Sequence, residues 1–270
     1  MFALKRGAAC AQWQRHGEAG MEGAAFWIAA VVAAALVGAS KGGLPVVGML
    51  AVPVLALVIS PITAAGLLLP VFVLSDAFGL YAYRHSFDRR VVAILAPAMT
   101  LGVLIGWGTA RIVPEPAVTV VVGGIGLAFA LTLLLRRGGG AAPRRAEVAP
   151  GLFWGTICGF TSFVSHAGAP PYQVYVLPLG LPKLVFAGTS TVVFAYLNAI
   201  KLIPYWALGQ FSAENLRVAV ILMPVAAGAV FAGLRLVKII PERLFFRLVA
   251  WALLLISVKL IWDGSHALLP

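Results

Sequence analysis

The sequence predicts an all-α protein that crosses a membrane several times, and three observations support this prediction. The 270 residues are 61% hydrophobic and 11% charged, whereas a soluble domain is about one quarter charged. Apolar runs close to the roughly 20 residues that a transmembrane helix needs fill nearly the whole chain. These runs lack the alternation of polar and apolar positions that a membrane β-barrel requires. We therefore expect bilayer lipid to be the solvent for most of the surface.

Apolar segments follow one another along the chain, and each predicts a helix or part of one. The run 170–181 is too short to span a bilayer. The stretches KGGLP, from Lys41, and HAGAPP, from His166, contain residues that interrupt helical hydrogen bonding. At membrane depth such breaks persist only where protein or a water-filled cavity satisfies the freed backbone groups. We therefore expect half-helices or re-entrant hairpins there. The segments are approximately 24–40, 44–60, 62–83, 91–113, 114–135, 150–165, 170–181, 183–208, 216–237 and 241–262.

The polar stretch RRGGGAAPRRAEVAP, residues 136–150, divides the chain into two halves that resemble each other. Asp76 aligns with Asn198, and after a short slip Pro114-Glu115 aligns with Pro241-Glu242. Chance matching of common residues is the alternative; the ordered series favours duplication of one unit. The expected organisation is an N-terminal tail (1–23), a membrane repeat (24–135), a linker (136–150), a second repeat (151–262) and a C-terminal tail (263–270).

Basic residues indicate how the two halves lie in the membrane. Loop 84–90 contains three arginines, whereas its counterpart 208–217 contains one, and the next pair of loops reverses this difference. Cytoplasmic loops are enriched in lysine and arginine. Equivalent loops would then face opposite sides, as in the inverted repeats of secondary transporters. The linker would be cytoplasmic. The cations of the N-terminal tail conflict with this arrangement unless Met21 is the true start.

The remaining composition excludes several classes of function. A net charge of +11 would suggest nucleic acid as a partner of a soluble protein. Here most cations lie between apolar runs and set the topology, so no nucleic-acid partner is expected. The two cysteines predict neither a disulfide framework nor a metal site, and we expect no cofactor. The N-terminus lacks the apolar core of a cleavable signal peptide. The oligomeric state is open, and a homo-oligomer is one alternative.

Four ionisable residues remain at membrane depth, and such residues are usually functional or paired inside the bundle. Lys41 lies in GASKGGLPVVG, where an ammonium beside exposed backbone N–H groups predicts an anion site. His166 lies in the equivalent break of the second half and can contact an anion or transfer a proton. Lys201 follows Asn198 by three residues, so both share one helix face. Asp76 can pair with a lysine or take up a proton, because burial favours the neutral carboxyl group.

Each of these residues also has a structural alternative. Either lysine can extend along a helix end to reach the headgroups. The histidine can be a neutral member of a helix junction, and Asp76 can belong to a buried pair that only holds helices together. The sequence leaves these alternatives open.

Four stretches carry the site candidates and their surroundings: GASKGGLPVVGMLAVPVLAL, LLLPVFVLSDAFGLYAYR, GFTSFVSHAGAPP and GTSTVVFAYLNAIKLIPYWALG. Together they resemble the sulfite exporter TauE/SafE family of bacterial membrane permeases. The resemblance implies duplicated membrane modules in the bacterial inner membrane that move sulfur-containing anions such as sulfite or sulfonates, by efflux. This chain departs from the family pattern: fewer glycines follow KGG, and Ser165-His166-Ala167-Gly168 stands where Gly-His-Gly-Gly is expected.

We therefore predict a permease for a small anion, in which the two breaks meet near the bilayer midplane. Two lysines would attract the anion, backbone N–H groups and hydroxyls would bind its oxygens, and Asp76 or His166 would couple a proton. The alternatives are a permease for a carboxylate, a cation transporter that uses Asp76, an intramembrane enzyme and a structural subunit. An enzyme would need a nucleophile–base pair, and the membrane segments of this sequence offer none. The predicted substrate-binding residues are Ser40, Lys41, Gly42, Gly43, Ser165, His166, Gly168, Pro170, Pro171, Thr189, Asn198 and Lys201.

Overall fold

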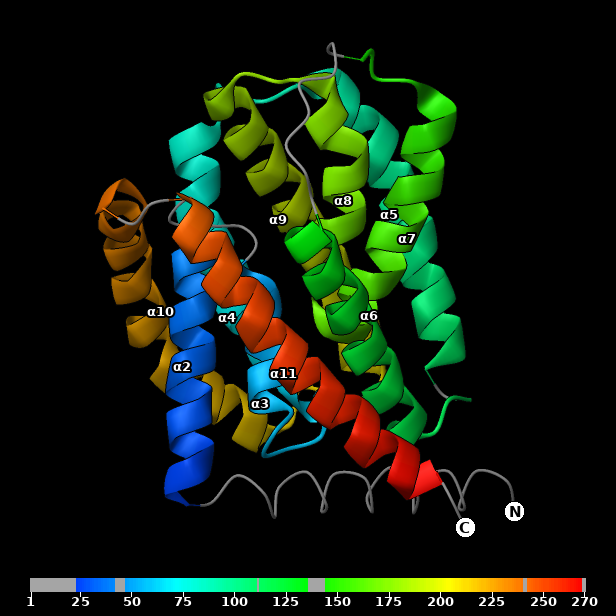
Figure 1. Cartoon of the computed structure of the whole chain (residues 1–270), viewed down its shortest axis with the longest axis vertical. Coiled ribbons are helices and arrows are strands. Elements are labelled where there is room, and N and C mark those ends of the chain that lie inside the picture. Colours follow the sequence, from blue (N-terminus) through cyan, green and yellow to red (C-terminus); the bar gives the residue numbers. More distant parts are fainter. Residues whose placement is uncertain (1–22, 42–46, 111, 136–143, 240–241, 269–270) are drawn as a thin grey trace.

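The computed structural model describes residues 23–41, 47–110, 112–135, 144–239 and 242–268 (Figure 1). Within these ranges the secondary structure is helical and no strand occurs, which confirms the predicted all-α class. The described elements are α2 (Ala24–Lys41), η1 (Val47–Leu50), α3 (Ala51–Leu55), α4 (Pro61–Tyr83), α5 (Arg89–Thr109), α6 (Glu115–Leu135), α7 (Val148–Ser165), α8 (Ala169–Val176), η2 (Leu177–Leu179), α9 (Lys183–Ala207), α10 (Ala213–Ile239) and α11 (Glu242–Leu268).

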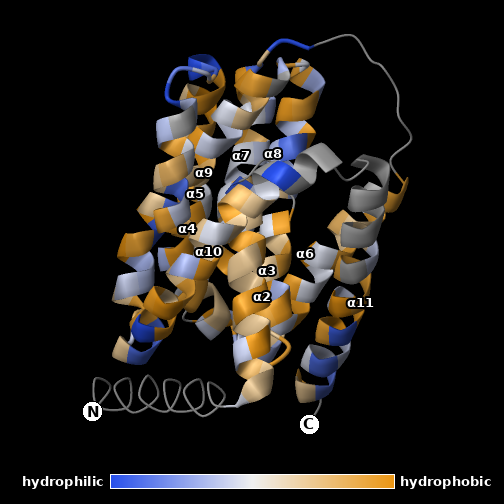
Figure 2. Cartoon of the chain, turned by 90° about the vertical axis from the view of Figure 1, so that its left-hand side faces the viewer, coloured by the Kyte–Doolittle hydropathy of each residue, from blue (hydrophilic) through white to orange (hydrophobic). Residues whose placement is uncertain are grey.

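Six described helices are long and apolar enough to cross a bilayer: α2, α4, α5, α7, α9 and α10. Hydrophobic residues extend along most of their length (Figure 2), and many large apolar side chains on their outer faces are exposed. A surface of this kind is stable only in lipid. Together these features identify a multi-pass membrane protein.

In their described residues, the two interrupted stretches contain only short helical pieces. The 3-10 helix η1 and α3 together cover residues 47–55 of the expected segment 44–60, and α8, with 8 residues, lies in the expected run 170–181. At about 1.5 Å per residue, α8 is about 12 Å long and cannot span a bilayer. Proline lies in its first turn, where the missing N–H has no helical partner to lose. Gly42 and Gly43 lie outside the described residues.

Two expected boundaries differ from the structure. Helix α7 begins at Val148, so the end of the expected linker is already helical. Helix α11 continues to Leu268, whereas the sequence predicted a tail from residue 263. Contacts one turn apart extend α11: Lys259 pairs with Asp263, and the Nδ1 atom of His266 donates to the carbonyl of Trp262. The drop in hydropathy therefore marks where the apolar surface ends rather than where the helix ends.

Helices α4 and α9 pack against each other at the centre, and α5, α7, α2 and α10 flank them (Figure 1). Helix α5 packs along α7, α2 along α10, and α6 along α11. Loop 84–88 contacts the N-terminal part of α9, because the backbone N–H of Asp88 donates to the hydroxyl of Thr189 (2.9 Å). Loop 208–212 follows the other end of this helix, which has 25 residues. The two loops therefore lie at opposite ends of the bundle.

Close packing of α5 on α7 depends on glycine. A Cβ atom at Gly102 would lie 2.1 Å from the carbonyl oxygen of Thr156, and one at Gly159 would lie 2.2 Å from the carbonyl oxygen of Met99. Contacts this short are impossible, so any side chain at either position would separate the helices. Small residues play this role at many membrane helix interfaces.

Gly102→Ala is therefore expected to lower stability by about 1–3 kcal/mol, the usual cost of overpacking. Gly108 is a matched control in the same helix, because no atom lies within 4 Å of a Cβ placed there. Thermal unfolding in detergent, followed by size-exclusion chromatography, should show a lower Tm for Gly102→Ala and no loss for Gly108→Ala. Equal Tm values would contradict the proposed helix contact.

Candidate functional site

One face of α4 and one face of α9 supply most of a buried polar network. Ala65, Phe72 and Asp76 are spaced by seven and four residues, so they lie along one face of α4. Asn198 and Lys201 are three residues apart on the facing helix, as predicted. The C-terminal end of α2 contributes Lys41. The network therefore joins elements from both halves of the chain.

The first part of the network is centred on Asp76, whose residue is only 2% exposed. One carboxylate oxygen lies 2.5 Å from the Nζ atom of Lys41, and the other accepts a 2.6 Å hydrogen bond from the side-chain amide of Asn198. A carboxylate can be buried at this depth because a cation and an amide donor replace its water. The two residues that the repeat alignment pairs, Asp76 and Asn198, thus contact each other directly.

The second part is centred on Lys201, which is completely buried. Its Nζ atom donates to the carbonyl oxygen of Ser162 (3.2 Å), to the hydroxyl of the same residue (3.1 Å) and to Nδ1 of His166 (2.7 Å). Three acceptors match the three N–H bonds of an ammonium group. None of these acceptors is a carboxylate, so the charge is solvated here but not neutralised.

His166 has the backbone conformation that ends α7. Its φ of 54° lies in the left-handed region, which few residues other than glycine adopt and in which histidine is enriched. This turn directs the ring toward α4, where Nε2 donates to the carbonyl of Ala65 (3.0 Å). Because a carbonyl only accepts, Nε2 holds the proton and Nδ1 is the acceptor for Lys201. The histidine is therefore neutral, with both nitrogens engaged.

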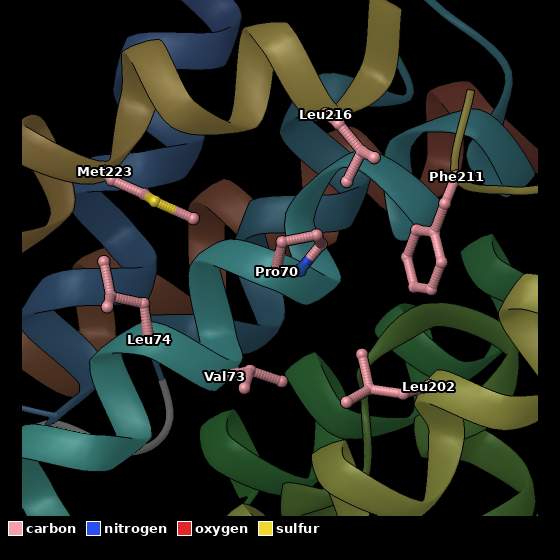
Figure 3. Close-up of a pocket in the computed structure, with 7 residues that line it drawn as sticks. All are labelled: Pro70, Val73, Leu74, Leu202, Phe211, Leu216 and Met223. Atoms are coloured by element: carbon pink, nitrogen blue, oxygen red, sulfur yellow. The ribbon is translucent and has the colours of Figure 1, made fainter. Parts of the chain in front are cut away.

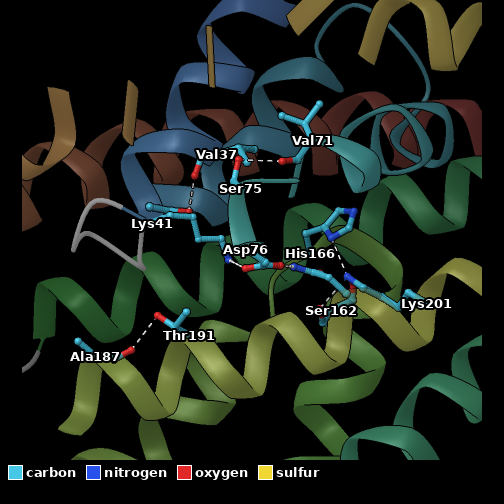
Figure 4. Close-up of polar contacts among 12 residues, drawn as sticks. Val37, Lys41, Val71, Ser75, Asp76, Ser162, His166, Ala187, Thr191 and Lys201 are labelled. Atoms are coloured by element: carbon cyan, nitrogen blue, oxygen red, sulfur yellow. Dashed lines mark hydrogen bonds and ion pairs between the residues drawn. The ribbon is translucent and has the colours of Figure 1, made fainter. Parts of the chain in front are cut away.

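Phe72 lies between the two parts of the network. Its ring stacks on the His166 ring, with centroids 4.7 Å apart, and the Nζ atom of Lys41 lies 5.6 Å from its centroid. Figure 4 shows the four ionisable residues side by side, supplied by α2, α4, the junction of α7 with α8, and α9. The arrangement contains two ammonium groups and one carboxylate around a shared aromatic wall. It is a buried site that gathers more basic than acidic side chains.

The structure thus brings together Lys41, Asp76, His166, Asn198 and Lys201, which the sequence had predicted as site residues. Other predicted residues lie elsewhere or are already engaged.

The hydroxyl of Thr189 lies at the α4–α5 turn, where it accepts from Asp88 and donates to the carbonyl of Val185. Nine residues separate it from Asn198, which is about 13.5 Å along the helix. Ser40 and Ser165 donate to carbonyls of their own helices.

Gly168, Pro170 and Pro171 lie at the start of α8. They do not donate hydrogen bonds to the polar network. A Cβ atom at Gly168 would lie 3.0 Å from the sulfur of Cys158, so this glycine allows the close approach of α8 to α7. Their contribution is to position the left-handed turn at His166.

Three contacts were missed in the sequence: the hydroxyl of Ser162, the carbonyl of Ala65 and the ring of Phe72. Ser162 precedes His166 by four residues and Phe72 precedes Asp76 by four, so each shares a helix face with a predicted site residue. Extending every predicted site residue by one helical turn would have found both side chains. A backbone carbonyl leaves no such signal.

Comparison with known proteins identifies a family at this point. The family model described as Sulfite exporter TauE/SafE matches residues 26–260, which include the whole polar network. No curated protein and no solved structure matches the chain. The resemblance seen in the sequence is therefore confirmed over most of its length.

The Lys41–Asp76 pair is expected to show strong coupling in a double-mutant cycle. Asp76→Leu alone leaves an ammonium that is only 10% exposed without its counter-ion, and breaking a buried pair costs about 3–5 kcal/mol. Lys41→Met combined with Asp76→Leu removes both charges and should recover most of that loss. Unfolding in detergent is measured for Asp76→Leu, for Lys41→Met alone and for the double variant. Additive effects would show that the two charges do not interact in the folded protein.

Proposed function

The chain belongs to the TauE/SafE family of sulfite exporters, and from this premise we propose that it exports sulfite or a related sulfur-containing anion, such as a sulfonate, across the bacterial inner membrane. Membership of this family identifies a membrane permease of the exporter type. The substrate, the outward direction and the coupling to protons are our proposals. The direction rests on the family alone.

The observation that carries the proposal is the complete burial of the Lys201 amino group. Among the described residues the ion pairs are Lys41–Asp76 and Lys259–Asp263, so Lys201 has no carboxylate partner there. An isolated charge in a low-dielectric interior costs many kcal/mol unless a counter-ion or several donors and acceptors replace its water. A transported anion of one negative charge would supply the missing counter-ion. It would be held against Lys201, Lys41 and the amide of Asn198.

Asp76 would act as an internal anion that holds Lys41 while the site is empty. An entering anion competes with this carboxylate for the same ammonium, and protonation of Asp76 would release Lys41 to the anion. His166 is less suited to this role, because a proton on Nδ1 would place two cations 2.7 Å apart. We therefore assign the coupled proton to Asp76. Both of its oxygens are engaged by donors, which disfavours the alternative of a cation bound there.

We also infer that the two halves are inverted repeats. The packing of α5 on α7 is matched by the packing of α10 on α2, as expected when equivalent helices exchange roles. Loops 84–88 and 208–212 lie at opposite ends of α9, which supports opposite orientation of equivalent loops. Near the first loop, Arg90 donates to the carbonyl of Ala146 and the backbone of Arg144 donates to that of Pro178. This arginine-rich end would face the cytoplasm.

The test is uptake into proteoliposomes with labelled sulfite, sulfate, a sulfonate and a carboxylate. Sulfite or the sulfonate is expected to move, and movement of sodium instead would contradict the anion proposal. Lys201→Gln should lower the rate by about tenfold or more, because a hydrogen bond to a charged group contributes about 1.5–3 kcal/mol. Lys259→Gln is the matched control, since that lysine is exposed on α11. Both variants are first checked for unchanged elution in size-exclusion chromatography.

The proposed role of Asp76 predicts a separate result. Asp76→Asn keeps the shape and a hydrogen-bonding group but cannot take up a proton, so its transport should no longer respond to an imposed pH gradient. His166→Asn should transport more slowly and still respond. Uptake of the preferred anion, measured with and without the gradient, distinguishes the two. A response that survives in Asp76→Asn and disappears in His166→Asn would assign the proton to the histidine.

A further inference from the structure

An apolar groove lies on the side of α4 that faces away from the polar network. Its volume is about 380 Å³, and α4 forms its floor between α9 and α10 (Figure 3). The consecutive helices α9 and α10 both pack on α4 and make few contacts with each other, which leaves the space between them. The lining side chains are Pro70, Val73, Leu74, Leu202, Phe211, Leu216 and Met223.

The groove runs along the helices from one end of the bundle toward its middle. Phe211 belongs to the turn between α9 and α10, and Leu216 lies in the first turn of α10. Met223 follows seven residues later, which is about 10.5 Å deeper along the helix. The groove is therefore elongated in the direction that a lipid acyl chain takes in a bilayer.

Its surroundings face lipid. On the two helices that border it, α9 and α10, the apolar residues Ile203, Trp206 and Val220 are 67%, 75% and 60% exposed. Side chains so exposed and so apolar, on helices that span a membrane, contact acyl chains. The groove is thus continuous with the lipid-facing surface and has no polar lining to hold water.

We propose that this groove binds one acyl chain of a phospholipid from the leaflet at the α9–α10 turn. Arg217 is exposed and directly follows Leu216 near the start of α10, so its long side chain can reach a lipid phosphate at the headgroup level. An acyl chain satisfies the apolar lining, and a phosphate satisfies the cation at the headgroup level. One ligand therefore accounts for both features.

The bound chain would support the helices that hold the polar network. Pro70 and Val73 line the groove, while Phe72 and Asp76 face the network from the same helix. Leu202 lines the groove next to Lys201. Pro70 lacks an N–H and so leaves α4 one hydrogen bond short at this level. A chain packed against this point would fix the spacing of α4, α9 and α10.

The test uses phosphatidylglycerol with a diazirine on its acyl chain, in nanodiscs that contain the purified protein. After photolysis, mass spectrometry maps the labelled residues. Labelling is expected to be at least several-fold higher at Leu216, Met223 and Val73 than at Leu104, a 52% exposed residue on α5 that does not line the groove. Uniform labelling of the lipid-facing surface, or labelling that avoids these residues, would overturn the proposal. The result does not depend on transport, so it stands or fails separately from the proposed function.

A pair of variants sharpens the test. Leu202→Trp fills the groove and should reduce labelling at Met223 to the level at Leu104, whereas Ile203→Trp adds the same side chain on the neighbouring exposed position and should not. If Leu202→Trp fails to fold, Val73→Phe replaces it. Labelling at Met223 that survives the filling variant would refute the groove as the site. Displacement of the label by an alkyl sulfonate, but not by unlabelled phosphatidylglycerol, would assign the groove to the tail of an amphipathic anion and overturn the lipid proposal.

Discussion

The burial of more positive than negative charge at the centre of an apolar bundle is the constraint on which the rest of the structure depends. Lipid cannot solvate an ammonium group, so the protein itself must supply acceptors around Lys201. Those acceptors come into place through three features of the fold. They are the left-handed turn at His166, the break before α8 and the packing of α4 against α9. A fold without these breaks would leave the charge without partners.

Helices α4 and α9 each contact the polar network on one face and apolar surroundings on another. Their inner faces hold hydrogen bonds and an ion pair at 2.5–3.2 Å, whereas their outer faces are apolar and border the groove. Proline within both helices weakens the backbone close to the network, at Pro70 and Pro204. Displacement of either helix therefore changes the polar contacts and the lipid contacts together. This double role suits a protein that must rearrange around a small ion.

Hydropathy was enough to predict the helices, because the bilayer imposes one length and one composition on every span. It failed at the end of α11, where contacts between polar side chains one turn apart continue the helix beyond its apolar part. The central residues were predictable because charges at membrane depth are rare. Phe72 was not, since an aromatic residue among apolar residues carries no signal of its partners. Thr189 shows the opposite error. Its hydroxyl was predicted to bind substrate, but in the structure it accepts a hydrogen bond from the backbone of Asp88 in the α4–α5 turn.

The contact between Asp76 and Asn198 has a consequence for the ancestry of the chain. Residues that are equivalent in the two halves meet only on the axis that relates those halves. In an ancestral homodimer of half-length chains, the two positions would be identical, and two carboxylates at this separation cannot both be ionised. The exchange of one acid for an amide removes that repulsion and makes the halves chemically different at their shared point. Under the proposed duplication, fusion into one chain would let the two positions diverge and form this unlike pair.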